Sequence, residues 1–221
     1  MISYDKRCIF IHIPKCGGTS IENIIWPDTE QRTERDLWMG FVPKYHNKYQ
    51  TGGLQHLLAR QVLEEVGKDI FDSFYKFAIV RNPWDRVVSQ FAYMQMRPDL
   101  MDFIGMNQKT EFKHYLDLIQ KKQHVQWMPQ TEFILGKDGT LLVDMIGHIE
   151  NFEEDSLKIF NKLGLYGAKS KVGHAKRSKR KKIDYYYSDL EAIEMVGQIF
   201  SADIEYFGYS FSGLLQVGTD V

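Results

Sequence analysis

The sequence contains little that would cross-link it, anchor it or give it a strong net charge. Only two of its 221 residues are cysteine, and the formal net charge is −1. Cys8 and Cys16 cannot form a disulfide framework and lack metal-ligand spacing, which favours a reducing compartment. A net charge near zero gives no global reason to expect nucleic acid or an anionic membrane as the partner. Any anion-binding site must therefore be local.

Long apolar runs and a secretion signal are also missing. No stretch approaches the roughly 20 apolar residues that cross a bilayer. Charged residues 5–7 stand directly before the first apolar run, with no apolar core of a signal peptide. We find no repeat, low-complexity block, linker or metal-binding cluster. We therefore expect one domain over residues 1–221, in a soluble cytoplasmic protein that has no membrane span and requires no metal.

The order of the expected elements favours an α/β fold with a largely parallel sheet. Residues 9–13 form an apolar, β-branched run typical of a buried strand, and residues 74–80 are predicted as a second buried strand. A turn and a helical pattern follow each run, and this repetition is typical of parallel sheets covered by helices. The other expected elements are strands over 131–135 and 141–149 and helices over 54–66, 83–93, 109–122, 152–163 and 188–204.

The stretch over residues 8–25 joins the first expected strand to a helix through a glycine turn, Pro14-Lys-Cys-Gly-Gly18. The first N–H groups of a helix have no partner within the helix, and the helix dipole favours negative charge there. Glycines let the backbone close around a phosphate, Lys15 adds a positive charge, and Thr19 and Ser20 add hydroxyls. The alternative is an ordinary connection with a surface lysine. Unlike in a Walker A motif, the lysine precedes the glycines.

A second polar segment follows the expected strand over residues 74–80. Arg81 would stand at the carboxyl edge of the sheet, where open α/β folds bind their ligands. Its guanidinium group suits phosphate oxygens, and Ser89 can add a hydroxyl from the following helix. Asp85 lies four residues before Ser89, on the same helix face. Pairing of Arg81 with Asp85 as a local brace explains this segment equally well.

Together the two segments resemble the P-loop-like sulfotransferases that use 3′-phosphoadenosine 5′-phosphosulfate (PAPS). That family has an IPK-x-G-[GS]-[TS]-S segment for the 5′-phosphosulfate and an R-[ND]-P-x-x-R-x-x-S segment for the 3′-phosphate. This chain has Ile13-Pro-Lys-Cys-Gly-Gly-Thr-Ser20 and Arg81-Asn-Pro-Trp-Asp-Arg-Val-Val-Ser89. The resemblance is greatest to the carbohydrate branch, which includes the heparan-sulfate 2-O-sulfotransferases, and to its soluble bacterial relatives. Looser matches over residues 130–133, 143–151 and 203–209 extend it along nearly the whole chain.

The resemblance implies a P-loop-like three-layer fold with a central, mainly parallel sheet flanked by helices. It implies sulfuryl transfer from PAPS to an acceptor hydroxyl, which we expect on a carbohydrate, with adenosine 3′,5′-bisphosphate as product. By carry-over, Arg81 and Ser89 would hold the 3′-phosphate. The basic segment around Arg177, Ser178 and Arg180 would close over the nucleotide, although a solvated run of charges is the commoner explanation. The 5′-phosphosulfate would be held by Lys15, Cys16, Gly17, Gly18, Thr19 and Ser20.

The reaction also needs a base, because the acceptor oxygen must lose a proton. Of the seven histidines, we favour His56, which begins the expected helix before the second strand. The heparan-sulfate 2-O-type enzymes have a catalytic histidine in a comparable place. His46 is the nearest competitor, and His12, within the first strand, is expected to be a satisfied core residue. Lys15 would stabilise the charge on the oxygen between sulfur and the departing 5′-phosphate.

Two other functions stay open. The glycine turn allows a P-loop small-molecule kinase, although the position of Lys15 and the lack of a clear acidic Mg²⁺ ligand after a strand speak against it. A non-catalytic nucleotide-binding protein would keep the donor site without the reaction.

Overall fold

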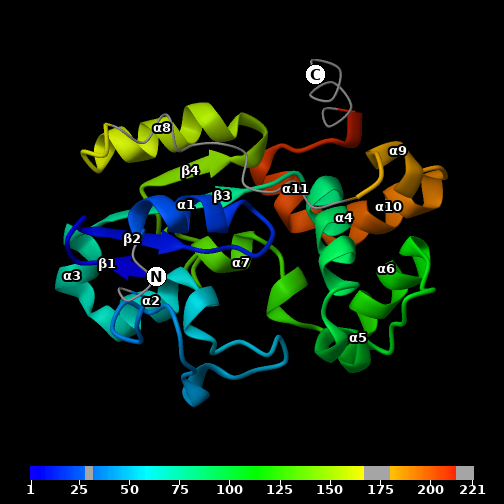
Figure 1. Cartoon of the computed structure of the whole chain (residues 1–221), viewed down its shortest axis with the longest axis horizontal. Helices are drawn as coiled ribbons and strands as arrows, with labels where there is room; N and C mark the ends of the chain where they lie inside the picture. The colour runs from blue at the N-terminus through cyan, green and yellow to red at the C-terminus, as the bar shows by residue number, and fades with distance from the viewer. Residues whose placement is uncertain (28–31, 167–179, 213–221) are drawn as a thin grey trace. The chain divides into compact units, whose positions relative to one another are not determined.

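A computed structural model describes residues 1–27, 32–166 and 180–212 of the chain (Figure 1). These residues form two compact units. The first unit contains residues 1–80 and 130–166, and the second contains residues 81–129 and 180–212. Each unit is therefore assembled from two separate stretches of the chain.

A four-stranded sheet forms the centre of the first unit. β2 pairs antiparallel with β1 and parallel with β3, and β3 pairs parallel with β4. β2 is fully buried, as is β3 after its first residue, and continuous burial is typical of strands covered on both faces. The expected α/β fold with a mainly parallel sheet is confirmed. In sheet order the strands are β1 (Ile2–Ser3), β2 (Cys8–Ile11), β3 (Tyr75–Val80) and β4 (Met145–His148).

Helices flank this sheet. Figure 1 shows α8 on one side of the sheet, where it contacts β4, and α2 with α7 on the other side. Helices on two faces of a sheet give the three layers that the sequence predicts. The helical elements of this unit are α1 (Gly18–Ile25), η2 (Pro43–Tyr45), η3 (Leu54–His56), α2 (Ala59–Val66), α3 (Lys68–Ser73), α7 (Thr131–Ile134), η5 (Ile149–Asn151) and α8 (Phe152–Lys162).

Three predicted elements of the first unit differ from the structure. The strand expected over residues 141–149 is shorter: β4 spans Met145–His148, and Ile149 begins the 3₁₀ turn η5. Residues 131–135 do not form the predicted strand, because they contain the short helix α7. The prediction is wrong because a short, mostly apolar segment is compatible with either structure. The helix expected over residues 54–66 is interrupted by the extended residues Leu57 and Leu58. His56 therefore ends a 3₁₀ turn before α2 and does not begin that helix.

The second unit is helical. Its core is made of aromatic and aliphatic side chains from several helices, among them Phe91 of α4, Tyr115 of α6 and Val196 of α10. α10 contacts both α4 and α6. The helix expected over residues 188–204 is divided at Phe200, and α5 was not predicted. The elements are α4 (Pro83–Met94), α5 (Pro98–Ile104), α6 (Phe112–Lys121), η4 (Val125–Trp127), α9 (Ile183–Tyr186), α10 (Leu190–Ile199) and α11 (Ser201–Phe207).

Candidate active site

The segment between β2 and α1 is a turn with a left-handed backbone at two positions. The φ angles are 68° at Lys15 and 79° at Gly17. Gly17 adopts this conformation readily, whereas a residue with a Cβ, such as Lys15, is strained by about 1 kcal/mol. α1 begins directly afterwards at Gly18. The predicted strand–glycine turn–helix arrangement is present, and the strained residue in it is the lysine.

Gly18 lies directly against the side chain of His12. A Cβ on Gly18 would be 2.0 Å from His12 Nε2, closer than real side chains tolerate. His12 Nδ1 lies 2.8 Å from Glu22 Oε1 of α1, and the two side chains are only 10% and 5% exposed. A buried histidine–carboxylate contact therefore joins the end of β2 to α1 next to the turn. The sequence did not identify Glu22 as this partner.

The candidate base His56 also contacts His12. The centroids of the two rings are 4.8 Å apart, and His56 Nδ1 lies 3.1 Å from the His12 carbonyl oxygen. A carbonyl oxygen only accepts hydrogen bonds, so Nδ1 carries the proton in this contact. The lone pair of the neutral His56 ring is then on Nε2. His12 thus contacts both the glycine turn and the candidate base.

The competing histidine, His46, is more exposed. It follows η2, and its ring centroid is 5.9 Å from that of Phe41. It lines a hollow together with Lys44, Arg60 and Glu64 among others. The structure records contacts of His56, and not of His46, with His12.

The Cys16 side chain is buried and directed at Gln130. Its Sγ lies 3.2 Å from Gln130 Oε1 and 3.6 Å from the Pro14 carbonyl oxygen, both acceptors. Gln130 is fully buried and stands just before α7. The thiol thus connects the turn to α7. Neither cysteine is in a disulfide, and burial raises the pKa of Cys8 to about 12.

The two hydroxyl residues of α1 differ in exposure. Thr19 is exposed, whereas Ser20 is buried and its N–H donates to the Gly17 carbonyl at 3.1 Å. Ile21 and Ile25 are buried on the apolar face that the sequence predicts. The start of α1 therefore presents Thr19 to solvent while its other side packs inward.

In the second unit, the second polar segment begins α4. The Asn82 side chain caps this helix by accepting from the Trp84 N–H at 3.1 Å, and Pro83 occupies the first helical position. Asp85 lies in the first turn, where the helix dipole favours a carboxylate. Ser89 lies one turn further on and is 4% exposed.

The Asp85 carboxylate contacts two arginines. Arg81 donates to its Oδ2 from Nε at 2.7 Å and also from Nη2. Arg180 Nη2 lies 2.6 Å from Oδ1. Burial raises the pKa of Asp85, but the positive charges of Arg81 and Arg180 outweigh it and hold that pKa below its ordinary value. The brace between Arg81 and Asp85 is therefore formed, and Arg180 shares it.

The other two residues carried over from the basic segment, Arg177 and Ser178, lie outside the described residues.

Comparison with known proteins identifies the family. The sequence profile of the sulfotransferase family matches residues 1–210. The chain belongs to the sulfotransferase family. It is a sulfuryl-transferring enzyme, as predicted, and the match includes both candidate segments. The heparan-sulfate 2-O branch stays a prediction.

The sulfotransferase is also similar to an uncharacterized protein of Archaeoglobus fulgidus. The two are 30% identical over 107 residues, which cover 48% of this chain and 82% of the archaeal protein. No solved structure matches the chain.

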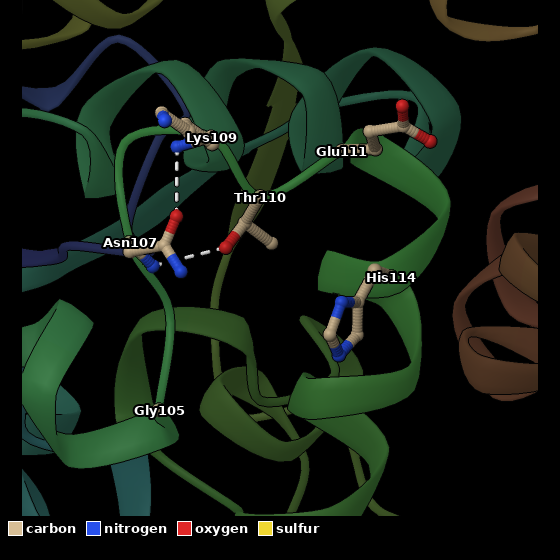
Figure 2. A pocket seen from close by; sticks show the side chains of 6 residues that line it. All are labelled: Gly105, Asn107, Lys109, Thr110, Glu111 and His114. Carbon is tan, nitrogen blue, oxygen red and sulfur yellow. Dashed lines mark hydrogen bonds between the residues drawn. The ribbon is translucent and has the colours of Figure 1, made fainter.

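A hollow near the start of α6 is lined by polar residues, and Figure 2 shows the Thr110 hydroxyl facing Asn107 while the Glu111 side chain points away. The Asn107 N–H donates to Thr110 Oγ1 at 2.9 Å, and the Lys109 N–H donates to Asn107 Oδ1 at 2.8 Å. Such bonds stabilise the turn before a helix. We therefore assign this hollow a structural role.

In the described part of the sulfotransferase, no helix combines the length and the apolar character needed to cross a bilayer. The same residues contain no group of three or more histidine, cysteine, aspartate or glutamate side chains placed to hold a metal ion.

Proposed function

We propose that this sulfotransferase moves the sulfuryl group of PAPS to a hydroxyl of a carbohydrate and releases adenosine 3′,5′-bisphosphate. The observation that supports it most is the pair of contacts from His12 to Gly18 and to His56. These contacts link the glycine turn to a histidine whose Nε2 carries the lone pair when the ring is neutral. An anion-binding turn next to a base is what transfer to a hydroxyl requires. The carbohydrate acceptor and PAPS are supported by the resemblance of the two segments.

In this proposal the first segment holds the 5′-phosphosulfate. The backbone N–H groups of Gly17, Gly18 and the first turn of α1 would bind its oxygens, together with the Thr19 and Ser20 hydroxyls and the Lys15 ammonium group. Cys16 would contribute its backbone N–H, because its thiol is directed at Gln130.

The second segment would hold the 3′-phosphate through Arg81 and Ser89, with Arg180 from the basic segment. β2 and β3 are parallel neighbours, and each segment directly follows one of them along the chain. This is the connectivity by which open α/β folds bring ligand-binding residues to one sheet edge. The roles of Arg177 and Ser178 stay predictions.

The family match runs without a break through stretches of both units. We therefore propose that residues 1–221 act as one sulfotransferase domain. The cytoplasmic location stays a prediction.

The proposed reaction is an in-line displacement at sulfur. His56 Nε2 takes the proton of the acceptor hydroxyl, whose oxygen forms a bond to sulfur. The bond between sulfur and the bridging oxygen breaks, and its electron pair stays on the 5′-phosphate of the product. Lys15 stabilises the charge that develops on that bridging oxygen. The His12 carbonyl stabilises the protonated His56 ring, because a hydrogen bond to a charged donor is the stronger one.

Transfer of labelled sulfate from PAPS to a panel of hydroxyl compounds tests this proposal. The panel contains saccharides, lipids, peptides and small alcohols, and we expect turnover with a saccharide. Lys15→Ala should lose most turnover. His56→Ala should lower turnover by about 10²–10⁴-fold while the affinity for adenosine 3′,5′-bisphosphate is kept. His46→Ala is the control and should keep its rate. A His56→Ala enzyme with a near-normal rate would refute the base assignment.

Thermal unfolding with added nucleotides separates the proposal from its rivals. A PAPS enzyme should be stabilised by adenosine 3′,5′-bisphosphate without metal, since a ligand that binds only the folded state raises the unfolding temperature. Stabilisation only by ATP with Mg²⁺ would indicate a kinase. Stabilisation by the bisphosphate without transfer to any acceptor would indicate a non-catalytic binding protein.

A further inference from the structure

A carboxylate between two arginines lies at the start of α4. Asp85 uses Oδ2 for Arg81 and Oδ1 for Arg180. Its backbone carbonyl also accepts from Arg180 Nη1 at 3.2 Å. Asp85 therefore holds the side chain of a residue that is 95 positions away along the chain.

Two guanidinium groups share this one carboxylate. Each guanidinium group is permanently charged. The Arg81, Asp85 and Arg180 side chains are only 13%, 16% and 23% exposed. A partly buried cationic cluster attracts an anion more strongly than a solvated lysine would, because water screens its charge less. Both guanidinium groups have the charge and the donor geometry that suit a phosphate.

The neighbouring contacts fix the cluster in place. The Asn82 cap and the position of Asp85 in the first helical turn hold the carboxylate at the N-terminus of α4. The Tyr187 hydroxyl donates to the Trp84 carbonyl at 2.8 Å, which ties the stretch after Arg180 to the same helical turn. The carboxylate therefore presents a defined geometry to both arginines.

We propose that Asp85 is a positioning residue for the 3′-phosphate of the donor, which it serves by holding the Arg81 and Arg180 guanidinium groups next to each other. This inference rests on the proposed function. The two like charges repel each other, and the carboxylate offsets that repulsion. The five N–H donors of a guanidinium group point in different directions, so one arginine can contact a carboxylate and a phosphate together.

Two nucleotides that differ only in the 3′-phosphate test this role. We would measure the dissociation constants of adenosine 3′,5′-bisphosphate and adenosine 5′-phosphate by calorimetry. The wild-type protein should prefer the bisphosphate by about 100-fold, because two charge-assisted contacts act on the extra phosphate. Asp85→Asn, which keeps the side-chain size, should reduce this preference about tenfold and leave the affinity for adenosine 5′-phosphate within about twofold. General damage to the fold would instead lower the affinity for both nucleotides by the same factor.

Asp184→Asn is the matched control. Asp184 is an exposed carboxylate near Arg180, on α9, and its substitution should leave both affinities unchanged. An Asp85→Asn protein with the wild-type preference, or with a larger one, would overturn the inference. A wild-type protein that does not distinguish the nucleotides would instead overturn the proposed donor site itself.

A second variant covers the case in which Asp85→Asn does not fold. Arg180→Ala removes the more exposed arginine and should also reduce the preference about tenfold. An unchanged preference in Arg180→Ala would overturn the inference. Where all variants fold, the two substitutions should combine to less than the product of their effects, because both remove the same arrangement.

Discussion

The two polar segments are built by different means. In the first unit the segment is mainly backbone: Lys15 and Gly17 have left-handed φ angles, and Gly18 has no room for a Cβ. In the second unit it is made of charged side chains, with Asp85 between Arg81 and Arg180. The first should therefore be sensitive to added volume, and the second to changed charge.

The largest effect should come from adding one methyl group to the first segment. Gly18→Ala places a Cβ 2.0 Å from His12 Nε2, so His12 or α1 must move. We expect a loss of about 2–3 kcal/mol in the free energy of unfolding, as for other overpacked positions, and a loss of bisphosphate binding. Urea unfolding and calorimetry measure the two quantities. Gly53→Ala is the control and should change neither quantity. Its new Cβ would have no heavy atom within 4 Å, and the φ angle of Gly53 is −65°.

A double substitution makes this test sharper. If the clash is with His12, then Gly18→Ala should cost less in a His12→Ala background than in the wild type. If Gly18→Ala lowered the free energy of unfolding equally in both backgrounds, Gly18 would not be needed to make room for the His12 side chain.

A charge change within the first unit should have a moderate effect. Glu22→Gln keeps the size of a buried side chain but removes the carboxylate next to His12 Nδ1. We expect a loss of about 2 kcal/mol, since one partner of a buried polar pair is weakened. Urea unfolding measures it, with the exposed Glu153 of α8 as the matched control, Glu153→Gln. If Glu22→Gln lowered the free energy of unfolding more than Gly18→Ala does, this unit would be more sensitive to changed charge than to added volume, and the comparison would be wrong.

The smallest effect should appear on acidification, at His124 of the second unit. Burial, helped by the charge of Arg97, lowers the pKa of His124 to about 4. The folded state thus keeps the His124 ring neutral. Once the pH is below the ordinary pKa of histidine, near 6.5, the ring takes up a proton when the protein unfolds. Stability therefore falls as the pH falls from about 6.5 towards 4. Because the ring is partly exposed to water, we expect a loss of about 1 kcal/mol between pH 7 and pH 5.

Urea titrations at the two pH values measure this loss. His124→Gln should lose about 1 kcal/mol less than the wild type on acidification, whereas the exposed His114→Gln should behave like the wild type. Equal losses in all three proteins would show that the acid sensitivity lies elsewhere.

The sequence predicts features that are encoded locally. The strand before the glycine turn and the start of α4 depend on an apolar run, glycines and Pro83, all of which are visible in a short window. The parallel sheet is predicted from the repeated order of strand, turn and helix. Residues 131–135 form a short helix and not the predicted strand, because five residues are too few for their apolar pattern to separate the two.

Contacts that depend on the tertiary fold could not be predicted. His12 and Glu22 meet because the glycine turn reverses the chain, and no spacing rule for a single helix or strand pairs them. Cys16 and Gln130 are 114 residues apart, and Arg180 and Asp85 are 95 apart. Long-range pairs of this kind follow from packing, whereas short patterns report only local structure.

The register between β3 and β4 has a consequence for synthesis on the ribosome. Phe77 lies opposite Met145, so the sheet is incomplete until β4 has left the exit tunnel. By then residues 81–129, the first stretch of the second unit, have already emerged between them. Parallel pairing over such a separation is slow, because a long loop must close first. A nascent chain arrested before residue 145 should therefore expose the edge of β3 that pairs with β4 and be a target for chaperones.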